Sequence, residues 1–455
     1  MIKKLLNYLE NKKILILGFG KEGETTYKLL RKYFPEKNLF VADKNMNLLN
    51  EKIELMEDPY LEVSLGENYL NGIEEYDLII KAPGISLKDV DLSNIGDKIT
   101  SQLELFLEFM PVYTIGITGT KGKSTTSSLM YKVLLDQGKD TFLLGNIGEP
   151  IFSSIEEIKK DSIVVLELSS HALEFVKKSP NIAILLDIYE EHLDHYKSFE
   201  KYIEAKYNVA KFQTENDFLL YNIDNENMKS FNFNYKENDY AISMEKVPDS
   251  KNKAYLENGL IYCNGIELMN SKEEMNLKGT HNLNNIMFIL SACSILNLDI
   301  KKAVSSIKEF KPLEHRMEFV ANINNVSYYN DSIATIPAST INAVTALGNV
   351  NTILVGGNDR GVDLSELIEF LRNHETIENI ICLPKTGEYI KEGLVNSNKN
   401  IEFFDELKSA VEFAKKVTKE NTICLLSPAA SSYGYFKNFE ERGKLFKQYV
   451  LDENV

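Results

Sequence analysis

The stretch that decides the fold is GITGTKGKSTT, residues Gly116–Thr126. It follows the apolar run Tyr113–Ile117 and precedes a segment of helical period that reaches about Gln137. A glycine-rich turn between a strand and a helix can aim backbone N–H groups at phosphate oxygens. The spacing departs by one position from the strict phosphate-loop pattern, because Gly116 precedes Gly122 by six residues. The stretch still favours ATP binding over a glycine turn with a chance Gly-Lys-Ser.

The residue types in this turn predict particular contacts with a nucleotide. Lys123 is placed to reach the β and γ phosphates, and Ser124 to offer its hydroxyl to Mg²⁺. Glycines in the turn permit the backbone to approach the phosphates closely. The predicted ATP-binding set in this segment is Gly119, Thr120, Gly122, Lys123, Ser124 and Thr125.

Apolar runs of four to eight residues alternate with segments of helical period along the chain, which is typical of parallel sheets covered by helices on both faces. The predicted strands are ILIL, LFVAD and DLII, then YTIGI, TFLL, SIVVLEL, NIAILLDI and FLLYNID, then VSYYND, TILVGG, NIICLP and TICLLSPA. We expect three α/β domains. They are a Rossmann-like domain at 1–100, a central domain resembling the P-loop ATPases with a mostly parallel sheet at 101–311, and a C-terminal Rossmann-like domain at 312–455.

Composition and charge exclude several classes of protein. The 455 residues include 51 Lys and Arg and 67 Asp and Glu, which gives a net charge of −16. Such a chain repels a phosphate backbone, so no nucleic-acid partner is expected. The four cysteines are far apart without CxxC spacing, which suits a reducing cytoplasm better than a disulfide framework. No signal peptide and no apolar stretch of membrane-spanning length is found. We therefore expect a cytoplasmic monomer.

Two predicted strands lead into residues that can bind a metal ion. Glu167 lies at the end of the run VVLEL, and His192 follows the run NIAILLDI. Ligands in an open parallel sheet commonly lie at the carboxyl ends of the strands. Phosphoryl transfer spreads negative charge over the transferred group, so the site needs hard ligands for Mg²⁺ beyond the phosphates. We expect Glu167 and His192, with Ser124, to hold Mg²⁺.

Taken together, these motifs resemble those of the Mur ligase family, and most closely its glutamate-adding branch. The resemblance covers all three expected domains and includes GITGTKGKSTT, LGNIGEP, HNLNN, LEHR, YYNDS and SPAASSYGYFKNFEERG. It implies that Asn282 contacts the adenine of ATP, Arg316 its phosphates and Asp331 its ribose. It also implies that Asn146, in LGNIGEP, contacts the acyl substrate. Finally, it implies that Lys206 is carbamylated and helps to hold Mg²⁺.

The first glycine turn, GFGKEG, allows two interpretations. It follows a predicted strand, and an aspartate stands twenty residues beyond its last glycine, so it satisfies the dinucleotide fingerprint of NAD-binding proteins. A lone fingerprint is weak, and the chain has no evident hydride-transfer site. The resemblance implies that this domain binds the UDP part of UDP-N-acetylmuramoyl-L-alanine, with KAPGI as a second loop. The predicted set is Gly18, Gly20, Gly23, Asp43, Pro83 and Gly84.

Glutamate is the acyl acceptor that the resemblance implies. Its two carboxylates call for cations, hydroxyls and backbone N–H groups. The C-terminal domain offers Arg360, Ser432, Tyr433 and Phe439 at matching positions. The stretch NDSIATIPAS departs from the family pattern NDSKATN, because Ile333 stands where a lysine is usual. D-glutamate is favoured, and L-glutamate stays open.

The sequence predicts ATP-dependent ligation through an acyl phosphate, with Lys123, Glu167, His192 and Lys206 as the catalytic residues. The segment SSHAL is closer to the diamino-acid-adding branch, so another ligase of the superfamily is an alternative. A folate-extending ligase lacks the GFGKEG domain. A nucleotide-gated binding protein would keep the ATP loop but would not need Glu167, His192 and Lys206 together. An NAD-dependent dehydrogenase is the alternative from another class of enzyme.

Overall fold

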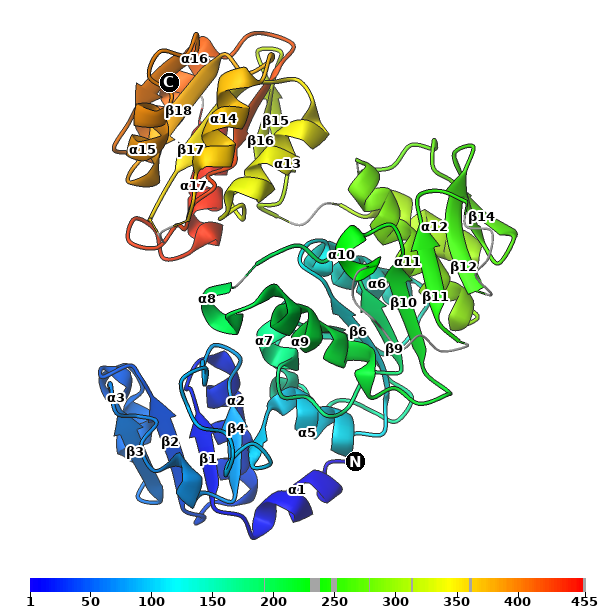
Figure 1. Ribbon diagram of the computed structural model, residues 1–455, viewed down its shortest axis with the longest axis vertical. Helices are drawn as coiled ribbons and strands as arrows, with labels where there is room; N and C mark the ends of the chain where they lie inside the picture. Colours follow the sequence, from blue (N-terminus) through cyan, green and yellow to red (C-terminus); the bar gives the residue numbers. More distant parts are fainter. Residues whose placement is uncertain are drawn as a thin grey trace. The chain divides into compact units, whose positions relative to one another are not determined.

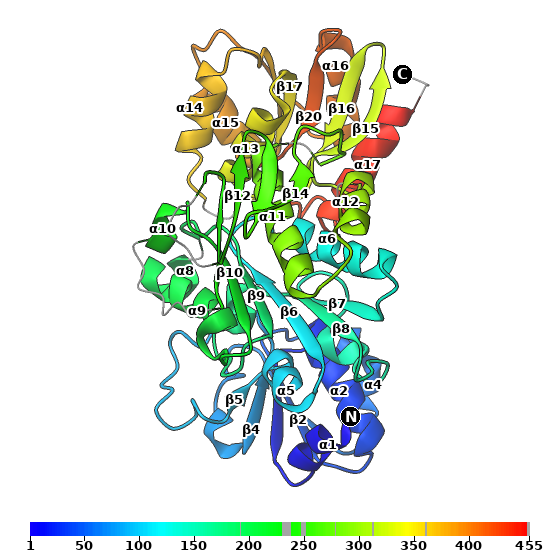
Figure 2. The same ribbon diagram turned by 90° about the vertical axis from the view of Figure 1, so that its right-hand side faces the viewer.

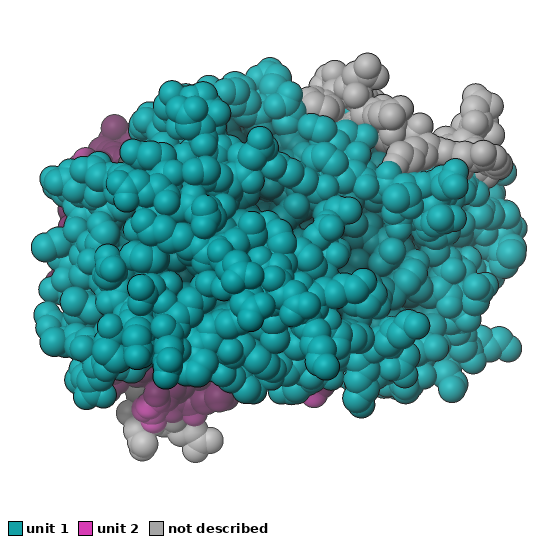
Figure 3. Space-filling model, turned by 90° about the horizontal axis from the view of Figure 1, so that it is seen from below, with its two compact units in different colours: residues 1–275, 280–310 teal, residues 276–279, 311–455 magenta. Residues whose placement is uncertain are grey.

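The computed structural model describes residues 1–191, 193–229, 238–246, 252–277, 279–311, 314–359 and 362–452. It is an α/β structure with three sheets, as the sequence predicts. The chain divides into two compact units (Figure 3): residues 1–275 with 280–310, and residues 276–279 with 311–455. The first unit contains the N-terminal and central sheets, and the second contains the C-terminal sheet. Within the described ranges, no helix combines the length and apolar character needed to cross a membrane.

Five parallel strands form the N-terminal sheet, in the order β3-β2-β1-β4-β5 (Figure 1). The central strands β1 and β4 are fully buried, which explains why their sequences are uninterrupted apolar runs. Leu17 of β1 lies opposite Lys81 of β4, so the glycine turn and the loop after β4 begin side by side. The elements are α1 Lys3–Glu10, β1 Ile14–Leu17, α2 Lys21–Tyr33, β2 Leu39–Asp43, α3 Leu48–Glu51, α4 Ile53–Met56, β3 Leu61–Leu65, η1 Ile73–Glu75, β4 Leu78–Lys81 and β5 Ile99–Thr100.

The central sheet has nine strands in the order β14-β13-β12-β11-β10-β9-β6-β8-β7. The strands from β12 to β7 are parallel, and β12, β13 and β14 pair antiparallel (Figure 2). Its first part comprises α5 Gln102–Phe109, β6 Tyr113–Thr118, α6 Lys123–Asp136, β7 Thr141–Gly145, η2 Ile151–Ser153, β8 Ile163–Glu167, α7 Ser170–Leu173 and β9 Ile182–Leu185. Its second part comprises α8 Leu193–Tyr196, α9 Phe199–Lys211, β10 Phe218–Asn222, α10 Glu226–Lys229, β11 Tyr240–Ser243, β12 Asn252–Glu257, β13 Leu260–Cys263, β14 Ile266–Asn270, α11 Thr280–Ile295 and α12 Ile300–Glu309.

Side-chain caps fix where several helices of the central part begin. Ser169 accepts a hydrogen bond from the backbone N–H of Ala172 at the start of α7, and Ser198 accepts one from Lys201 at the start of α9. Such caps satisfy backbone donors that the first helical turn leaves open. They fix the start of α7, which follows β8, and the start of α9, which follows β9 and α8 in the chain.

The C-terminal sheet has six strands in the order β15-β16-β20-β17-β18-β19. The hairpin of β15 with β16 is antiparallel, and the other pairs are parallel. All seven residues of β17 are buried, so this strand lies in the core of the unit. The elements are β15 Glu318–Ile323, β16 Val326–Asn330, α13 Pro337–Leu347, β17 Val350–Gly356, α14 Ser365–Asn373, β18 Asn379–Leu383, α15 Thr386–Gly393, β19 Asn400–Phe403, α16 Leu407–Val417, β20 Ile423–Leu426 and α17 Phe439–Leu451.

Candidate active site

The turn between β6 and α6 has the backbone of a phosphate-binding loop. Gly122 has φ +85° and forms the N-cap of α6, which starts at Lys123. A Cβ at Gly122 would lie 2.8 Å from Oδ1 of Asn285, so any other residue would clash as well as strain the backbone. The free N–H groups of the first turn of α6 favour an anion. The turn therefore fits the triphosphate of a nucleotide.

Hydrogen bonds hold the loop and its lysine in place. Nζ of Lys123 donates to the carbonyl oxygens of Gly119 at 2.9 Å and Thr120 at 3.0 Å. The backbone N–H of Thr120 donates to the carbonyl of Asp187, 2.7 Å away, just beyond β9. Its hydroxyl lies 2.9 Å from the hydroxyl of Tyr202 on α9. Ser124 and Thr125 follow Lys123 in the first turn of α6.

Glu167 occupies the last position of β8, opposite Ile117 of β6. Its side chain is 1% exposed, and Oε1 accepts a hydrogen bond of 2.7 Å from Nδ2 of Asn146. The other oxygen, Oε2, is buried and has no hydrogen-bond partner among the described residues. An orphaned carboxylate oxygen is expensive to bury. This oxygen suits a divalent cation, which prefers hard oxygen ligands.

Lys206 projects from α9 to the same loop. Its Nζ donates to the carbonyl of Gly119 at 2.8 Å, so that one oxygen accepts from both Lys206 and Lys123. The side chain is 2% exposed, and its Nζ lies 4.8 Å from the ring centroid of Tyr202. Burial, and secondarily the Lys123 charge, hold the pKa of Lys206 well below its usual value. This environment favours the neutral amine over the ammonium.

His192 lies outside the described residues. Within the described part of the chain, no group of three or more His, Cys, Asp and Glu side chains is arranged as a metal site. The nearby helix α8 carries His195, whose Nε2 lies 3.1 Å from Oε2 of Glu174 and whose ring contacts that of His171.

The residues predicted for the rest of the nucleotide lie on two units. Asn282 is on α11 of the first unit, buried, and its Oδ1 accepts a hydrogen bond of 3.3 Å from Asn285. Arg316 and Asp331 belong to the second unit. The carboxylate of Asp331 accepts hydrogen bonds from the backbone N–H of Met317 at 3.1 Å and the hydroxyl of Ser427 at 2.8 Å. Burial raises the pKa of Asp331 to about 7.

The N-terminal glycine turn is braced by Asp43. One carboxylate oxygen accepts from the backbone N–H of Phe19 at 2.6 Å, and the other from that of Asn45 at 2.7 Å. Gly18 precedes this contact and Gly20 forms the N-cap of α2. A Cβ at Gly23 would lie 2.1 Å from the carbonyl oxygen of Gly18, so α2 can approach the turn only with glycine there.

The second N-terminal loop follows β4 and contains Pro83 and Gly84. It packs on the glycine turn, since Ala82 donates its N–H to the carbonyl of Leu17 at 2.8 Å. Gly84 is exposed and Pro83 half-buried. The two loops therefore form one edge of the N-terminal sheet.

The residues predicted for glutamate lie at the strand ends of the second unit, except Arg360, which falls outside the described residues. Ser432 is buried, whereas Tyr433 is 55% exposed. Phe439 is the first residue of α17, and its carbonyl accepts a hydrogen bond of 2.8 Å from the hydroxyl of Ser332. Ile333 directly follows that serine.

Sequence reasoning missed Arg442, the largest fully buried side chain in the described residues. Its guanidinium donates to the hydroxyl and carbonyl of Ser332, at 3.0 and 2.8 Å, and to the carbonyl of Ala430. Burial lowers the pKa of Arg442 to about 10. It therefore ties the segment after β16 to the loop after β20. Its burial could have been predicted, because Arg442 lies between Phe439 and Phe446 at the spacing of one face of a helix.

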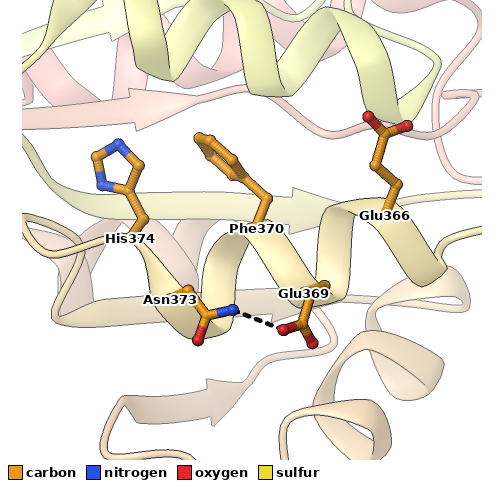
Figure 4. A pocket seen from close by; sticks show the side chains of 5 residues that line it. All are labelled: Glu366, Glu369, Phe370, Asn373 and His374. Carbon is orange, nitrogen blue, oxygen red and sulfur yellow. Dashed lines mark hydrogen bonds between the residues drawn. The ribbon is translucent and has the colours of Figure 1, made fainter.

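A hollow of about 420 Å³ lies on α14, away from these strand ends (Figure 4). Figure 4 shows Glu366, Phe370 and His374 projecting from one side of the helix, while Asn373 donates to Glu369. No predicted site residue lines it. A smaller hollow, at the ends of β17 and β18, includes Ser432 and Arg442 in its lining.

Comparisons with known proteins agree with these motifs. Two family models match, the Mur ligase middle domain over residues 117–293 and the Mur ligase glutamate ligase domain over residues 315–430. A UDP-N-acetylmuramoylalanine–D-glutamate ligase of Clostridium botulinum is 33% identical over 98% of both chains. One of Clostridium tetani is 34% identical over 97% of both chains.

Solved structures share the fold at lower identity. The UDP-N-acetylmuramate-alanine ligase MurC of Thermotoga maritima gives a TM-score of 0.59 at 17% identity, with 96% of this chain and 99% of that chain covered. A MurF ligase of the same organism, solved in complex with ADP, gives 0.58 at 15% identity, with 97% and 96% covered.

Proposed function

Because the chain belongs to the Mur ligase family, we propose that it catalyses the ATP-dependent addition of D-glutamate to UDP-N-acetylmuramoyl-L-alanine in peptidoglycan precursor synthesis. The observation that carries this proposal is the meeting of Lys123, Lys206 and the glycine loop at the carbonyl of Gly119, beside the strand that ends in Glu167. A glycine loop with its lysine and a nearby carboxylate supports phosphoryl transfer, which depends on positioned positive charge and on oxygen ligands for a metal ion.

The reaction divides into two steps. In the first, an oxygen of the L-alanine carboxylate attacks the γ-phosphorus of ATP, and the bond from that phosphorus to the bridging oxygen of ADP breaks. In the second, the glutamate amine attacks the acyl carbon, loses a proton and expels inorganic phosphate. Lys123 would neutralise the charge that develops in the first step.

A magnesium ion would be held by Ser124, Glu167, His192 and the carbamate of Lys206. Bound there, it would supply positive charge to the phosphate oxygens. The unpartnered Oε2 of Glu167 supports this assignment. Asn146 supports it too, because its amide fixes the orientation of the same carboxylate.

The carbamate of Lys206 is supported by the environment of its amine. Carbamylation joins a neutral amine to CO₂ and converts a cationic side chain into an anionic one. Burial favours the neutral amine, and the adjacent Lys123 disfavours a second positive charge. Exposure to ¹³C-labelled bicarbonate should give a carbamate signal in the wild-type NMR spectrum and none in Lys206→Met.

The remaining predicted residues would bind the three substrates. Asn282, Arg316 and Asp331 would contact the adenine, phosphates and ribose of ATP. The UDP-linked substrate would lie on Gly18, Gly20, Gly23, Asp43, Pro83, Gly84 and Asn146. Glutamate would lie near Arg360, Ser432, Tyr433 and Phe439. We also propose that the chain has three domains, at 1–100, 101–311 and 312–455, and that the protein is a cytoplasmic monomer.

The test supplies purified protein with ATP, Mg²⁺ and UDP-N-acetylmuramoyl-L-alanine, and offers D-glutamate, L-glutamate or a diamino acid in separate reactions. We expect phosphate release and a new peptide product with D-glutamate, as the names of the relatives favour. Product with L-glutamate alone would correct the stereochemistry, which Ile333 leaves open. Product only with a diamino acid would overturn the branch assignment, and a nicotinamide oxidation without phosphate release would overturn the ligase.

A further inference from the structure

Lys81, the last residue of β4, is a buried lysine that the proposed function does not yet use. It lies next to Leu17 in the register of the sheet, directly before the loop that packs on the glycine turn. The whole residue is 3% exposed. Its position at the end of β4 and its burial place Lys81 beside the loops proposed for the nucleotide-sugar.

The ammonium of Lys81 is poorly satisfied in this structure. Within the part of the chain that the structure describes, its three N–H donors make one hydrogen bond, of 3.4 Å, to the carbonyl of the adjacent Ala82. Among the described residues no carboxylate oxygen lies within the 4.0 Å of an ion pair, and Nζ faces the ring of Phe175 at 5.4 Å. Burial lowers the pKa of Lys81 to about 8, and the charges of Glu174 and Glu22 oppose this only in part. A buried, incompletely paired cation weakens a fold unless something else is gained.

The neighbourhood of Lys81 suits an anion. Helix α2 begins at the glycine turn, and a thirteen-residue helix presents unpaired N–H groups and positive dipole at this end. Glu22, in the first turn of α2, acts on Lys81 by its charge, but burial raises the pKa of this carboxyl to about 7, so it offsets the ammonium only in part. A diphosphate carries at least two negative charges and oxygens on several sides, and can accept from the turn and from an ammonium at once.

We propose that the Lys81 ammonium binds the diphosphate of the nucleotide-sugar substrate, an inference that rests on the proposed function. Lys81 then acts as a positioning residue that fixes the substrate by its phosphates and takes no part in bond making. The ring of Phe175, whose centroid lies 5.4 Å from Nζ of Lys81, contacts the ammonium as well. The unfavourable burial of the lysine in the free protein is offset when the diphosphate arrives.

The experiment compares Lys81→Met with the wild type in the full chain, by calorimetric titration with UDP and with uridine. Met keeps the length of the side chain and removes the charge. We expect UDP to bind at least tenfold more weakly to the variant and uridine to bind equally. Lys88→Met, which removes an exposed lysine from the same loop, should bind UDP like the wild type, and Lys81→Arg should retain part of the affinity.

Kinetics and stability separate a binding role from a structural one. The KM for UDP-N-acetylmuramoyl-L-alanine should rise about tenfold in Lys81→Met, while the KM for ATP stays unchanged. The melting temperature of the free variant should equal or exceed that of the wild type, because a poorly paired buried charge is removed. A lower melting temperature with equal weakening of UDP and uridine would overturn the inference in favour of a structural lysine. Unchanged UDP binding would overturn it while leaving the ligase intact. A wild type that binds no UDP would overturn both.

Discussion

The phosphate loop of the central sheet and the glycine turn of the N-terminal sheet use the same backbone device with different charges around it. Both lie between a parallel strand and a helix whose N-cap is glycine. At the phosphate loop, two lysines donate to one carbonyl, and a carboxylate oxygen on the next strand has no partner. At the glycine turn, each carboxylate oxygen of Asp43 accepts a hydrogen bond from a backbone N–H group. We infer that the backbone of such a turn can bind an anion in both places. The side chains around it determine whether a metal ion can bind there and whether catalysis can occur.

Lys123→Ala should have the largest effect. It tests whether the phosphate loop, and not the N-terminal glycine turn, lies in the catalytic site. Loss of the ammonium removes charge stabilisation in phosphoryl transfer, so turnover should fall by about 10³-fold or more. Phosphate release measures this, and circular dichroism should report an intact fold. Lys132→Ala, farther along α6 and paired with Asp136, is the matched control and should stay close to wild-type activity. Near-normal turnover of Lys123→Ala would contradict the assignment of this loop as the ATP-binding site.

Glu167→Gln should rank next and tests the unpartnered oxygen. The amide keeps the shape of the carboxylate but removes the negative charge that binds a divalent cation. We therefore expect turnover to fall by roughly 10²-fold and the Mg²⁺ concentration that gives half the maximal rate to rise. A Mg²⁺ titration of the rate measures both. The melting temperature without Mg²⁺ should not fall, because no ion pair is lost. Asp161→Asn, at the exposed opposite end of β8, should change neither quantity. An unaltered Mg²⁺ dependence in Glu167→Gln would count against a metal at this carboxylate.

Asp43→Ala probes the other half of the comparison, where the carboxylate braces a binding loop. Two charge-assisted hydrogen bonds are lost, which should lower the free energy of unfolding by about 2 kcal/mol. The KM for the UDP-linked substrate should rise roughly tenfold by loss of loop order, with the Mg²⁺ requirement unchanged. Glu62→Ala on the neighbouring β3 is the exposed control. A changed Mg²⁺ requirement in Asp43→Ala would erase the distinction between the two turns.

The smallest expected effect is a pH dependence of stability that Lys81 introduces. Its pKa is about 8 in the folded protein and near 10.5 when unfolded. Between these values the unfolded state binds more protons, so this group makes the folded protein more stable as pH rises. The melting temperature of the wild type relative to Lys81→Met should therefore increase from pH 8 to pH 10. A difference that is flat over this range would contradict the depressed pKa.

Local sequence pattern was sufficient to predict the buried parallel strands and the glycine turns that follow them. The predicted runs Ile14–Leu17 and Leu39–Asp43 coincide with β1 and β2, because fully or largely buried parallel strands leave a continuous apolar signature. The glycine turns were recognisable because close approach demands glycine at fixed spacing. The segment of helical period that was predicted to reach about Gln137 agrees with α6, which ends at Asp136.

Other features had no such signature. Strands β11 to β14 were not predicted, because short half-buried strands such as Asn252–Glu257 mix polar and apolar residues. The burial of Lys81 and Arg442 depends on elements distant in the chain, and no local period reports it. The same holds for the meeting of Lys206 with the phosphate loop, which the family resemblance implied and the residue pattern alone did not. The proposed roles of His192 and Arg360 stay predictions.

The carbonyl oxygen of Gly119 couples the side chains of Lys123 and Lys206. Lys123 and Lys206 both donate to it, so altering either one changes the hydrogen bonding and the local potential felt by the other. Residues that share an acceptor are thermodynamically coupled, and their substitutions do not add. A double-mutant cycle across this pair will therefore have a non-zero interaction energy. The contribution of Lys123 or Lys206 to stability or activity therefore cannot be assigned from a single substitution of either residue.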